Sequence, residues 1–189
     1  MNRERIFVAW VSDRPGVLTR IASVFFRRSI NIMSLNVAST QISRVSKMVI
    51  RAAGDEHELL RVKRQISRLV DTLRVDVLSA DTAVLDELCF ARVRLDDAKA
   101  HDTLLTAMRP YGCKVVRVDD QSIVLSLTST PTTIDHFLGA LAPYGLIDIS
   151  RTGVTSAPLA QEPLEPSALQ TAARTAQDLL NDRSSEDPS

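Results

Sequence analysis

The order of strand-like and helix-like segments constrains this chain most, because the same order occurs twice. Strand-like segments are rich in β-branched and apolar residues, and helical segments repeat apolar residues at three- and four-residue spacing. The first occurrence covers residues 5–11, 18–28, 31–40, 44–53, a helix begun by residues 54–56, and 72–78. The second covers residues 88–95, 99–111, 113–118, 122–127, a helix begun by residues 130–131, and 146–150.

Each occurrence reads β-α-β-β-α-β, which is the ferredoxin-like arrangement of a four-stranded antiparallel sheet with two helices on one face. We therefore expect an α+β protein with two ferredoxin-like domains, the first at residues 4–79 and the second at 86–157. A short polar connection is expected at residues 79–86. Proline, serine, glutamine and acidic residues dominate after residue 157, so we expect 158–189 to be a flexible tail, largely disordered in isolation.

The first strand-like segment is apolar on both faces, which are Ile6, Val8 and Trp10, and Phe7, Ala9 and Val11. It should therefore be a central strand that is covered on both sides. Because the two helices cover only one face of such a sheet, we expect an exposed apolar surface that serves as an interface. One face of the 31–40 strand is also apolar, through Met33, Leu35 and Val37. These patterns predict a homodimer with a two-fold contact through the first domain.

Both helices of the first unit have a predicted core face. The first helix carries its main apolar stripe at Leu18, Ile21, Ala22 and Phe25, and a narrower one at Val17 and Val24. The second carries an apolar stripe at Leu59, Val62, Ile66, Leu69 and Val70. Its other face is basic, through Arg61, Lys63, Arg64 and Arg68, and we interpret this face as a solvated helix surface.

Composition excludes several classes of function. The 23 basic residues balance the 23 acidic ones, which argues against nucleic acid as a partner. No apolar run approaches the ~20 residues that span a bilayer, and the N-terminus does not resemble a signal peptide, so we expect no membrane association. Cys89 and Cys113 have no His or Cys at metal-ligand spacing and are interpreted as small buried hydrophobes. We expect a cytoplasmic protein.

The sequence contains no constellation that indicates catalysis. His57, His101 and His136 are scattered along the chain, and the glycines are single and far apart, so no phosphate-binding loop is present. We therefore predict no catalytic residues and no metal site. Binding or regulation is favoured, although a fold alone does not establish function.

The run from Ser12 to Leu18 is the strongest candidate for a binding site. Pro15 suits the first turn of a helix, and Gly16, which lacks a Cβ, lets a ligand approach the backbone closely. The free N–H groups of the helix start would suit a small carboxylate, such as that of an amino acid. The alternative interpretation is a plain tight turn.

These residues also resemble a known family. The first block is Asp13-Arg14-Pro15-Gly16-Val17-Leu18-Thr19-Arg20-Ile21, and the second is Arg27-Arg28-Ser29-Ile30-Asn31-Ile32-Met33-Ser34-Leu35-Asn36-Val37. Further matches are Ser46-Lys47-Met48-Val49-Ile50, Leu69-Val70-Asp71, Pro143-Tyr144-Gly145 and Arg151-Thr152-Gly153. Over about residues 5–157 the chain resembles the small regulatory subunit of acetohydroxyacid synthase (acetolactate synthase), which begins with an ACT domain.

The resemblance implies a role in branched-chain amino acid biosynthesis. A small subunit of this family binds the large catalytic subunit, raises its activity and confers feedback inhibition by valine or a related branched-chain amino acid. Thiamine diphosphate, Mg and FAD are then expected in the catalytic partner, with no cofactor in this chain. The effector is expected between two ACT domains of a dimer, which carries its contacts onto Asp13 and Gly16 of one chain and Asn31 of the other.

Three positions depart from the family pattern. Asp13 replaces an Asn, and an ionised Asp only accepts hydrogen bonds and would repel an effector carboxylate. Two outcomes are open: Asp13 pairs with the ammonium of the effector, or effector binding is weak or altered. Ser29 replaces a Gly at a helix end where a left-handed backbone is expected, so Ser29 either adopts that backbone at a cost of about 1 kcal/mol or forms another cap. Met33 replaces an acidic residue.

Two other functions remain open from the sequence. One is a stand-alone ACT-type amino-acid-sensing module that regulates another enzyme. The other is a small ferredoxin-like lyase or isomerase, for which the sequence offers no acid–base pair.

Overall fold

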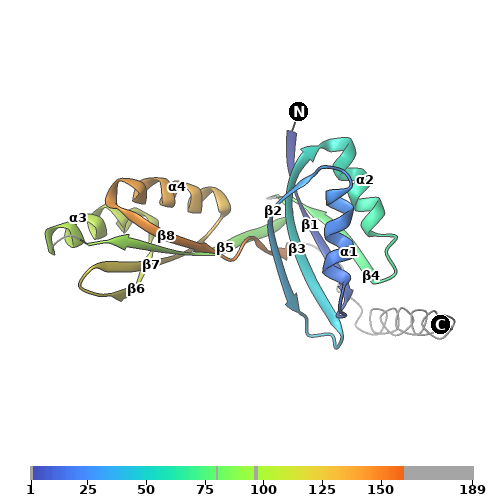
Figure 1. Cartoon of the computed structure of the whole chain (residues 1–189), viewed down its shortest axis with the longest axis horizontal. Helices are drawn as coiled ribbons and strands as arrows, with labels where there is room; N and C mark the ends of the chain where they lie inside the picture. The colour runs from blue at the N-terminus through green and yellow to red at the C-terminus, as the bar shows by residue number, and fades with distance from the viewer. Residues whose placement is uncertain (1, 80, 96–97, 160–189) are drawn as a thin grey trace, which may run out of the picture. The chain divides into compact units, whose positions relative to one another are not determined.

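The computed structural model describes residues 2–79, 81–95 and 98–159. The chain divides into two compact units, one formed by residues up to Val84 with the segment from Ser156, and one by Leu85–Thr155. Each unit contains an antiparallel sheet and two helices (Figure 1), so the predicted α+β class with two ferredoxin-like domains is confirmed. The predicted tail at 158–189 lies almost wholly outside the described residues.

The first unit follows the predicted order of elements. These are β1 (Asn2–Ser12), α1 (Val17–Phe26), β2 (Asn31–Ser39), β3 (Val45–Asp55), α2 (Glu56–Ile66) and β4 (Thr72–Leu78). The strands lie in the order β2-β3-β1-β4, and all neighbours are antiparallel. The first strand is therefore central, as predicted, and β2 and β4 form the edges of this sheet.

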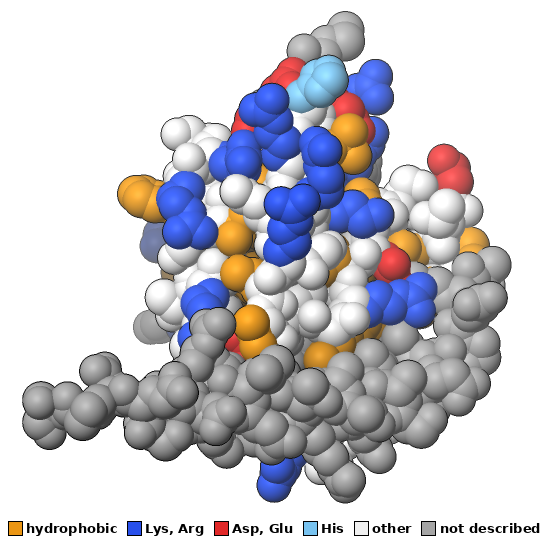
Figure 2. Space-filling view, turned by 90° about the vertical axis from the view of Figure 1, so that its right-hand side faces the viewer, with side chains coloured by type: hydrophobic (Ala, Val, Ile, Leu, Met, Phe, Trp, Pro, Cys, Tyr) orange, Lys and Arg blue, Asp and Glu red, His pale blue; other side chains and the backbone are white. Residues whose placement is uncertain are grey.

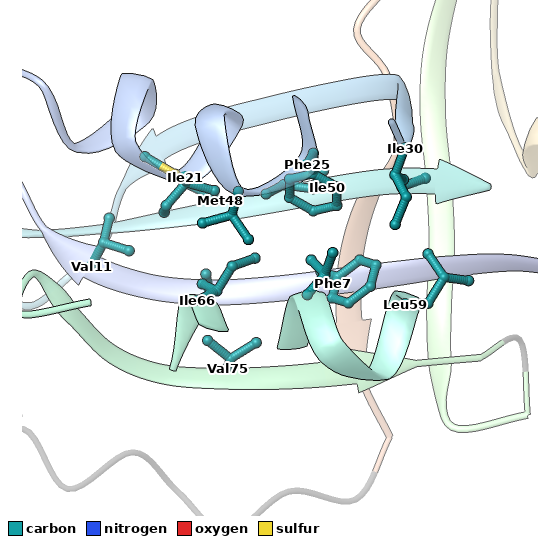
Figure 3. Packing of buried hydrophobic residues seen from close by; sticks show 14 of the residues in the cluster. Phe7, Val11, Ile21, Phe25, Ile30, Met48, Ile50, Leu59, Ile66 and Val75 are labelled. Carbon is teal, nitrogen blue, oxygen red and sulfur yellow. The ribbon is translucent and has the colours of Figure 1, made fainter. Parts of the chain in front are cut away.

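The main core of this unit lies between the two helices and the sheet, where Figure 3 shows side chains from both layers meeting. Phe7 of β1 contacts Phe25 of α1 edge to face, with ring centroids 5.5 Å apart. The predicted core face of α1 is partly wrong, because Val17 and Val24 are buried whereas Leu18 is 43% exposed. Ile21 and Phe25 of the predicted main stripe are buried as well, so the core face combines residues from both predicted stripes.

The second helix is shorter than its apolar pattern predicted. It begins after Asp55, whose side chain accepts a hydrogen bond from the His57 amide, and it ends at Ile66. Leu69 and Val70 lie in the turn that follows, where the Leu69 amide donates to the Ile66 carbonyl. Leu69 still packs against the core, so its apolar character reflects burial in a turn rather than helical structure.

The face of β1 that points away from the helices is also buried. Ile6, Val8 and Trp10 are at most 7% exposed, so coverage on both sides is confirmed and the predicted exposed apolar surface on this strand is wrong. The cationic groups of Lys47 and Arg74 lie 5.8 and 5.4 Å from the centroid of the Trp10 ring. Burial lowers the pKa of the Lys47 ammonium group, which donates a hydrogen bond to a backbone carbonyl.

That carbonyl belongs to Ser156, which lies 109 residues further along the chain, and the nitrogen–oxygen distance is 2.6 Å. Ser156 is part of a short strand, β9 (Thr155–Pro158), that the sequence pattern did not predict. It pairs with β5, and the Leu159 amide donates to the Thr82 carbonyl. The first unit therefore includes residues from the far end of the described chain.

The second unit repeats the same order. Its elements are β5 (Ala83–Arg94), α3 (Ala98–Met108), β6 (Lys114–Val118), β7 (Ser122–Ser129), α4 (Pro131–Leu141) and β8 (Leu146–Arg151), with short 3₁₀ turns at Arg109–Tyr111 and Ala142–Tyr144. The strand order is β6-β7-β5-β8. The polar connection predicted at residues 79–86 is wrong in its second half, because β5 begins at Ala83 and is extended by its pairing with β9.

The Pro-Tyr-Gly motif has the same backbone geometry at both places where it occurs in this unit. Gly112 and Gly145 each follow a 3₁₀ turn and have a positive φ, as predicted for the two Pro-Tyr-Gly runs.

Near the end of the unit, Thr152 holds the chain against β5. The Thr152 amide donates to the Leu88 carbonyl, and the Thr152 hydroxyl accepts from the Leu88 amide. Gly153 then turns the chain with φ of 73°.

Candidate functional site

The connection from β1 to α1 is a β-turn over Arg14–Val17. The Val17 amide donates to the Arg14 carbonyl at 3.4 Å, and Gly16 has φ of 82° and ψ of −8°. These angles, with proline at the preceding position, define a type II turn, which requires a positive φ at its third residue. The prediction that Pro15 occupies the first turn of the helix is therefore wrong, because Pro15 precedes the N-cap residue Gly16.

The start of α1 has no side-chain cap. Gly16 is the N-cap residue, and the first turn contains no acidic residue. The Gly16 carbonyl accepts from the Arg20 amide at 3.0 Å, whereas the amides of Leu18 and Thr19 meet no acceptor within the described residues. Two free N–H groups and the positive end of the helix dipole thus form a place where a carboxylate can bind.

A cationic side chain lies beside this turn. Arg20 Nη2 donates to Asp71 Oδ2 at 2.5 Å, and Arg20 Nη1 lies 3.1 Å from the position that a Cβ on Gly16 would occupy. Asp71 is only 3% exposed, and its carbonyl accepts from the Ser12 amide at 2.8 Å. Asp71 therefore fixes both the end of β1 and the guanidinium group next to Gly16.

Unpaired polar atoms lie below the same turn. Asp71 Oδ1, Ser12 Oγ and Thr72 Oγ1 are buried and have no hydrogen-bond partner among the residues that the structure describes. Thr72 is opposite Val11 in the sheet, so the three atoms lie where the C-terminal end of β1 meets the start of β4. Buried polar atoms are normally paired, so these three atoms can form hydrogen bonds with groups outside the described residues.

The three predicted site residues do not all meet within one chain. Asp13 is exposed next to Gly16, and its amide donates to the Arg44 carbonyl at 2.8 Å in the β2–β3 connection. Asn31 starts β2 opposite Ala53, which in turn is opposite Glu4 at the beginning of β1. Eight residue steps of β1 separate that position from Ser12, a distance of about 26 Å.

Two of the residues that depart from the family pattern lie at irregular points of the backbone. Ser29 has φ of 52°, so the left-handed backbone predicted there is confirmed, and the following Ile30 amide donates to the Phe25 carbonyl. Met33 is the extra residue of a bulge between Ile32 and Ser34. The bulge breaks the alternation that placed Met33 and Leu35 on one face, which corrects that prediction.

Comparison with known proteins decides the family. One family model, described as "AHAS small subunit-like ACT domain", matches residues 8–74, and another, "Small subunit of acetolactate synthase", matches residues 86–157. The acetolactate synthase small subunit of Mycolicibacterium smegmatis is 34% identical over 146 residues, which are 77% of this chain and 85% of that protein. The chain belongs to the acetolactate synthase small-subunit family. Its members are the regulatory, non-catalytic subunits of that enzyme.

Other relatives agree with this assignment. A probable acetolactate synthase small subunit of Methanothermobacter thermautotrophicus is 29% identical over 80% of this chain and 90% of its own length. The crystal structure of the acetolactate synthase small subunit of Thermotoga maritima superposes with a TM-score of 0.75, over 85% of this chain and 99% of that one. At 23% identity this likeness supports the fold. As a small subunit, the chain associates with a large catalytic subunit.

Arg20 and Asp71 are the residues of the acetolactate synthase small subunit's candidate site that sequence reasoning missed. Both lie inside motifs that carried the family resemblance, yet their spacing of 51 residues gives no periodic signal that they pair. Elsewhere in the described segments, no group of three or more His, Cys, Asp and Glu side chains could hold a metal ion. No helix in those segments is long and apolar enough to cross a membrane.

Proposed function

We propose that this small subunit activates the large catalytic subunit of acetolactate synthase and makes it subject to feedback inhibition by a branched-chain amino acid, with valine as the first candidate. The observation that carries the proposal is the uncapped start of α1, where two free amides lie beside the Arg20 guanidinium group. Thiamine diphosphate, Mg and FAD belong in this proposal to the catalytic subunit, and the complex works in the cytoplasm.

The turn has the chemistry to bind both charged groups of an amino acid. The effector carboxylate accepts hydrogen bonds from the Leu18 and Thr19 amides, and Arg20 adds a charge-assisted interaction. The effector ammonium pairs with the Asp13 carboxylate, which replaces the amide that is usual in the family. Asp71 positions Arg20, because it holds the guanidinium group through a bond of 2.5 Å.

Completion of the site needs a second copy of the chain, because Asn31 lies at the other end of the sheet. Among the described residues, the edge strand β2 pairs with β3 alone, so its other side can pair with the same strand of another copy. Antiparallel pairing centred on Leu35 places Asn31 beside Ser39 of the second copy. That end of β2 leads into the connection where Arg44 holds the Asp13 amide, so Asn31 reaches the turn.

Exposed apolar side chains support the same homodimer. Leu18 and Phe26 on α1 are 43% and 83% exposed, and Met33 and Val37 on β2 are 46% and 44% exposed. These residues belong to the helix and the strand that the two-fold contact would bury. Surfaces of this kind mark protein interfaces.

The decisive experiment is an assay of the cognate catalytic subunit with and without this chain, during titration with valine, leucine and isoleucine. We expect the chain to raise acetolactate formation, and one of the three amino acids to reverse that increase. Binding of the same amino acid to the isolated chain is measured by calorimetry. If the chain fails to co-purify with the catalytic subunit but binds an amino acid, a stand-alone sensor for another enzyme is the correct function.

A further inference from the structure

A hollow lined mainly by arginines lies on the outer face of α2. Its lining residues are Arg28, Arg61, Arg64, Gln65 and Arg68, and its volume is about 280 Å³. Figure 2 shows Lys and Arg side chains gathered on this side of the molecule, around a surface with few acidic groups. The sequence pattern identified three of these arginines as part of a solvated helix face, but it did not show that Arg28 from the end of the first helix joins them.

The hollow carries a surplus of positive charge. The Glu58 carboxylate pairs with two of these arginines. It accepts a hydrogen bond of 2.7 Å from Arg28 and one of 2.8 Å from Arg61. The hydrogen bond from Arg28 is the main reason why the pKa of Glu58 is lowered. Arg64 and Arg68 form no ion pair with any residue that the structure describes. Four guanidinium groups thus face one carboxylate, although acidic and basic residues balance over the whole chain.

Part of the hollow is held in place before any ligand arrives. Arg28 donates from Nε to Gln65 Oε1 at 2.9 Å and from Nη1 to Glu58, so its guanidinium group is fixed at both ends. A preorganised cation loses less conformational entropy when it binds an anion. Arg64 and Arg68 are exposed, which leaves their donors free for bidentate bonds to carboxylates.

We propose that this hollow docks a carboxylate-rich segment of the large catalytic subunit. Arg61 and Arg64 belong to α2, Arg68 lies in the turn after Ile66 and Arg28 follows α1, so the charge is spread over several elements and more widely than one amino-acid carboxylate or one phosphate can match. In an extended segment, side chains on one face repeat about every 6.6 Å, which allows two carboxylates to reach the arginines together.

The surroundings of the hollow also fit a protein partner. Leu60 is 47% exposed and lies one helical turn from Arg64, so an apolar contact borders the charged one. Arginine is enriched in protein interfaces, where it often carries much of the binding energy. The proposal rests on the proposed function for the identity of the partner, but it does not depend on effector binding.

The test compares two doubly substituted chains that have the same total charge. Arg64→Glu with Arg68→Glu reverses charge in the hollow, and Arg109→Glu with Arg117→Glu reverses two exposed charges in the second unit. Affinity for the catalytic subunit is measured by biolayer interferometry at low and at physiological salt. We expect the first variant to bind at least about tenfold more weakly, with a flatter salt dependence, and the second to stay within about twofold of the parent.

Equal affinity of the first variant and the parent would overturn the proposal, and so would an equal loss in both variants. Two further readouts separate it from the proposed function. Calorimetry with valine should give the same affinity for the parent and the first variant, since the hollow is not the effector site. At saturating small subunit, the first variant should reach the parent's maximal activation, and its half-activating concentration should rise by the same factor as its dissociation constant.

A competition experiment identifies the kind of anion. A short poly-glutamate peptide should displace the catalytic subunit from the parent chain. The ligand would instead be a small polyanion if tripolyphosphate bound the isolated parent chain but not the first variant, while both chains kept the same affinity for the catalytic subunit. That result would overturn the docking role.

Discussion

The carboxylate of Asp71 holds the guanidinium group of Arg20 against the turn at Gly16, across 51 residues of sequence. Asp71 is buried and Arg20 is half-exposed, so this pair joins the core of the first unit to a surface that a ligand can reach. Within one chain, the ion pair stabilises the fold of the first unit. In the proposed dimer, it also orients the Arg20 guanidinium group toward the effector. Loss of either side chain should therefore affect stability and effector binding differently.

Substitution Arg20→Gln should weaken effector binding about tenfold or more, because one charge-assisted hydrogen bond to the carboxylate is lost. Its effect on the free energy of unfolding should be smaller, about 1 kcal/mol, since Arg20 is half-exposed and solvent screens the pair. Urea denaturation and calorimetry measure the two quantities. Asp71→Asn serves as the comparison, and a double-mutant cycle that gives no coupling energy between the two positions would contradict this account.

Substitution Gly16→Trp should abolish effector binding. The new side chain must leave from a backbone with φ of 82°, and its Cβ would lie 3.1 Å from Arg20 Nη1. The ring then fills the approach to the free amides. Gly112→Trp is a suitable control, because φ there is also positive but a Cβ meets no atom within 4 Å. Retention of effector binding by Gly16→Trp would place the site elsewhere.

Substitution Asp13→Asn should change effector affinity by roughly tenfold or more, because it restores an amide donor and removes a charge. A fall in affinity is expected if Asp13 pairs with the effector ammonium. Calorimetry with valine, leucine and isoleucine on parent and variant measures the change. Equal affinities for all three amino acids would show that Asp13 does not contact the effector.

Light scattering should give the mass of a dimer at micromolar concentration. Val37→Lys on β2 should shift the population toward monomer, because a charge replaces a 44%-exposed apolar side chain in the proposed contact. Val84→Lys provides the control, since Val84 is 48% exposed and lies outside β2. A parent chain that stays monomeric, or equal behaviour of both variants, would contradict the two-fold contact.

The two cysteines should react slowly with a thiol reagent in the native chain. Burial raises the pKa of Cys89 and of Cys113, so at mildly alkaline pH each holds less of the reactive thiolate than free cysteine does. Cys89 is also fully buried, and we expect it to be the slower of the two. Both should react at the rate of a free thiol in concentrated guanidinium chloride. Fast reaction of Cys89 in the native chain would show that its strand opens readily.

The order of elements could be predicted from the sequence because period-two and helical patterns depend on near neighbours in the chain. The pairing of Arg20 with Asp71 could not, since it links residues 51 positions apart. The bulge at Met33 was missed because one extra residue leaves no mark on composition. The position of Pro15 could not be predicted either, because proline suits both the second residue of a type II turn and the first turn of a helix.

The bond between Lys47 and Ser156 has a consequence for synthesis of the chain. The first unit includes residues from Ser156 onward, which the ribosome adds only after the entire second unit. From Val84 to Ser156 the ribosome needs about 4–14 s at 5–20 residues per second. During that interval the nascent first unit lacks the strand that Lys47 contacts, beside the Trp10 ring. The Trp10 face of the sheet therefore gains this contact only after the second unit has been synthesised.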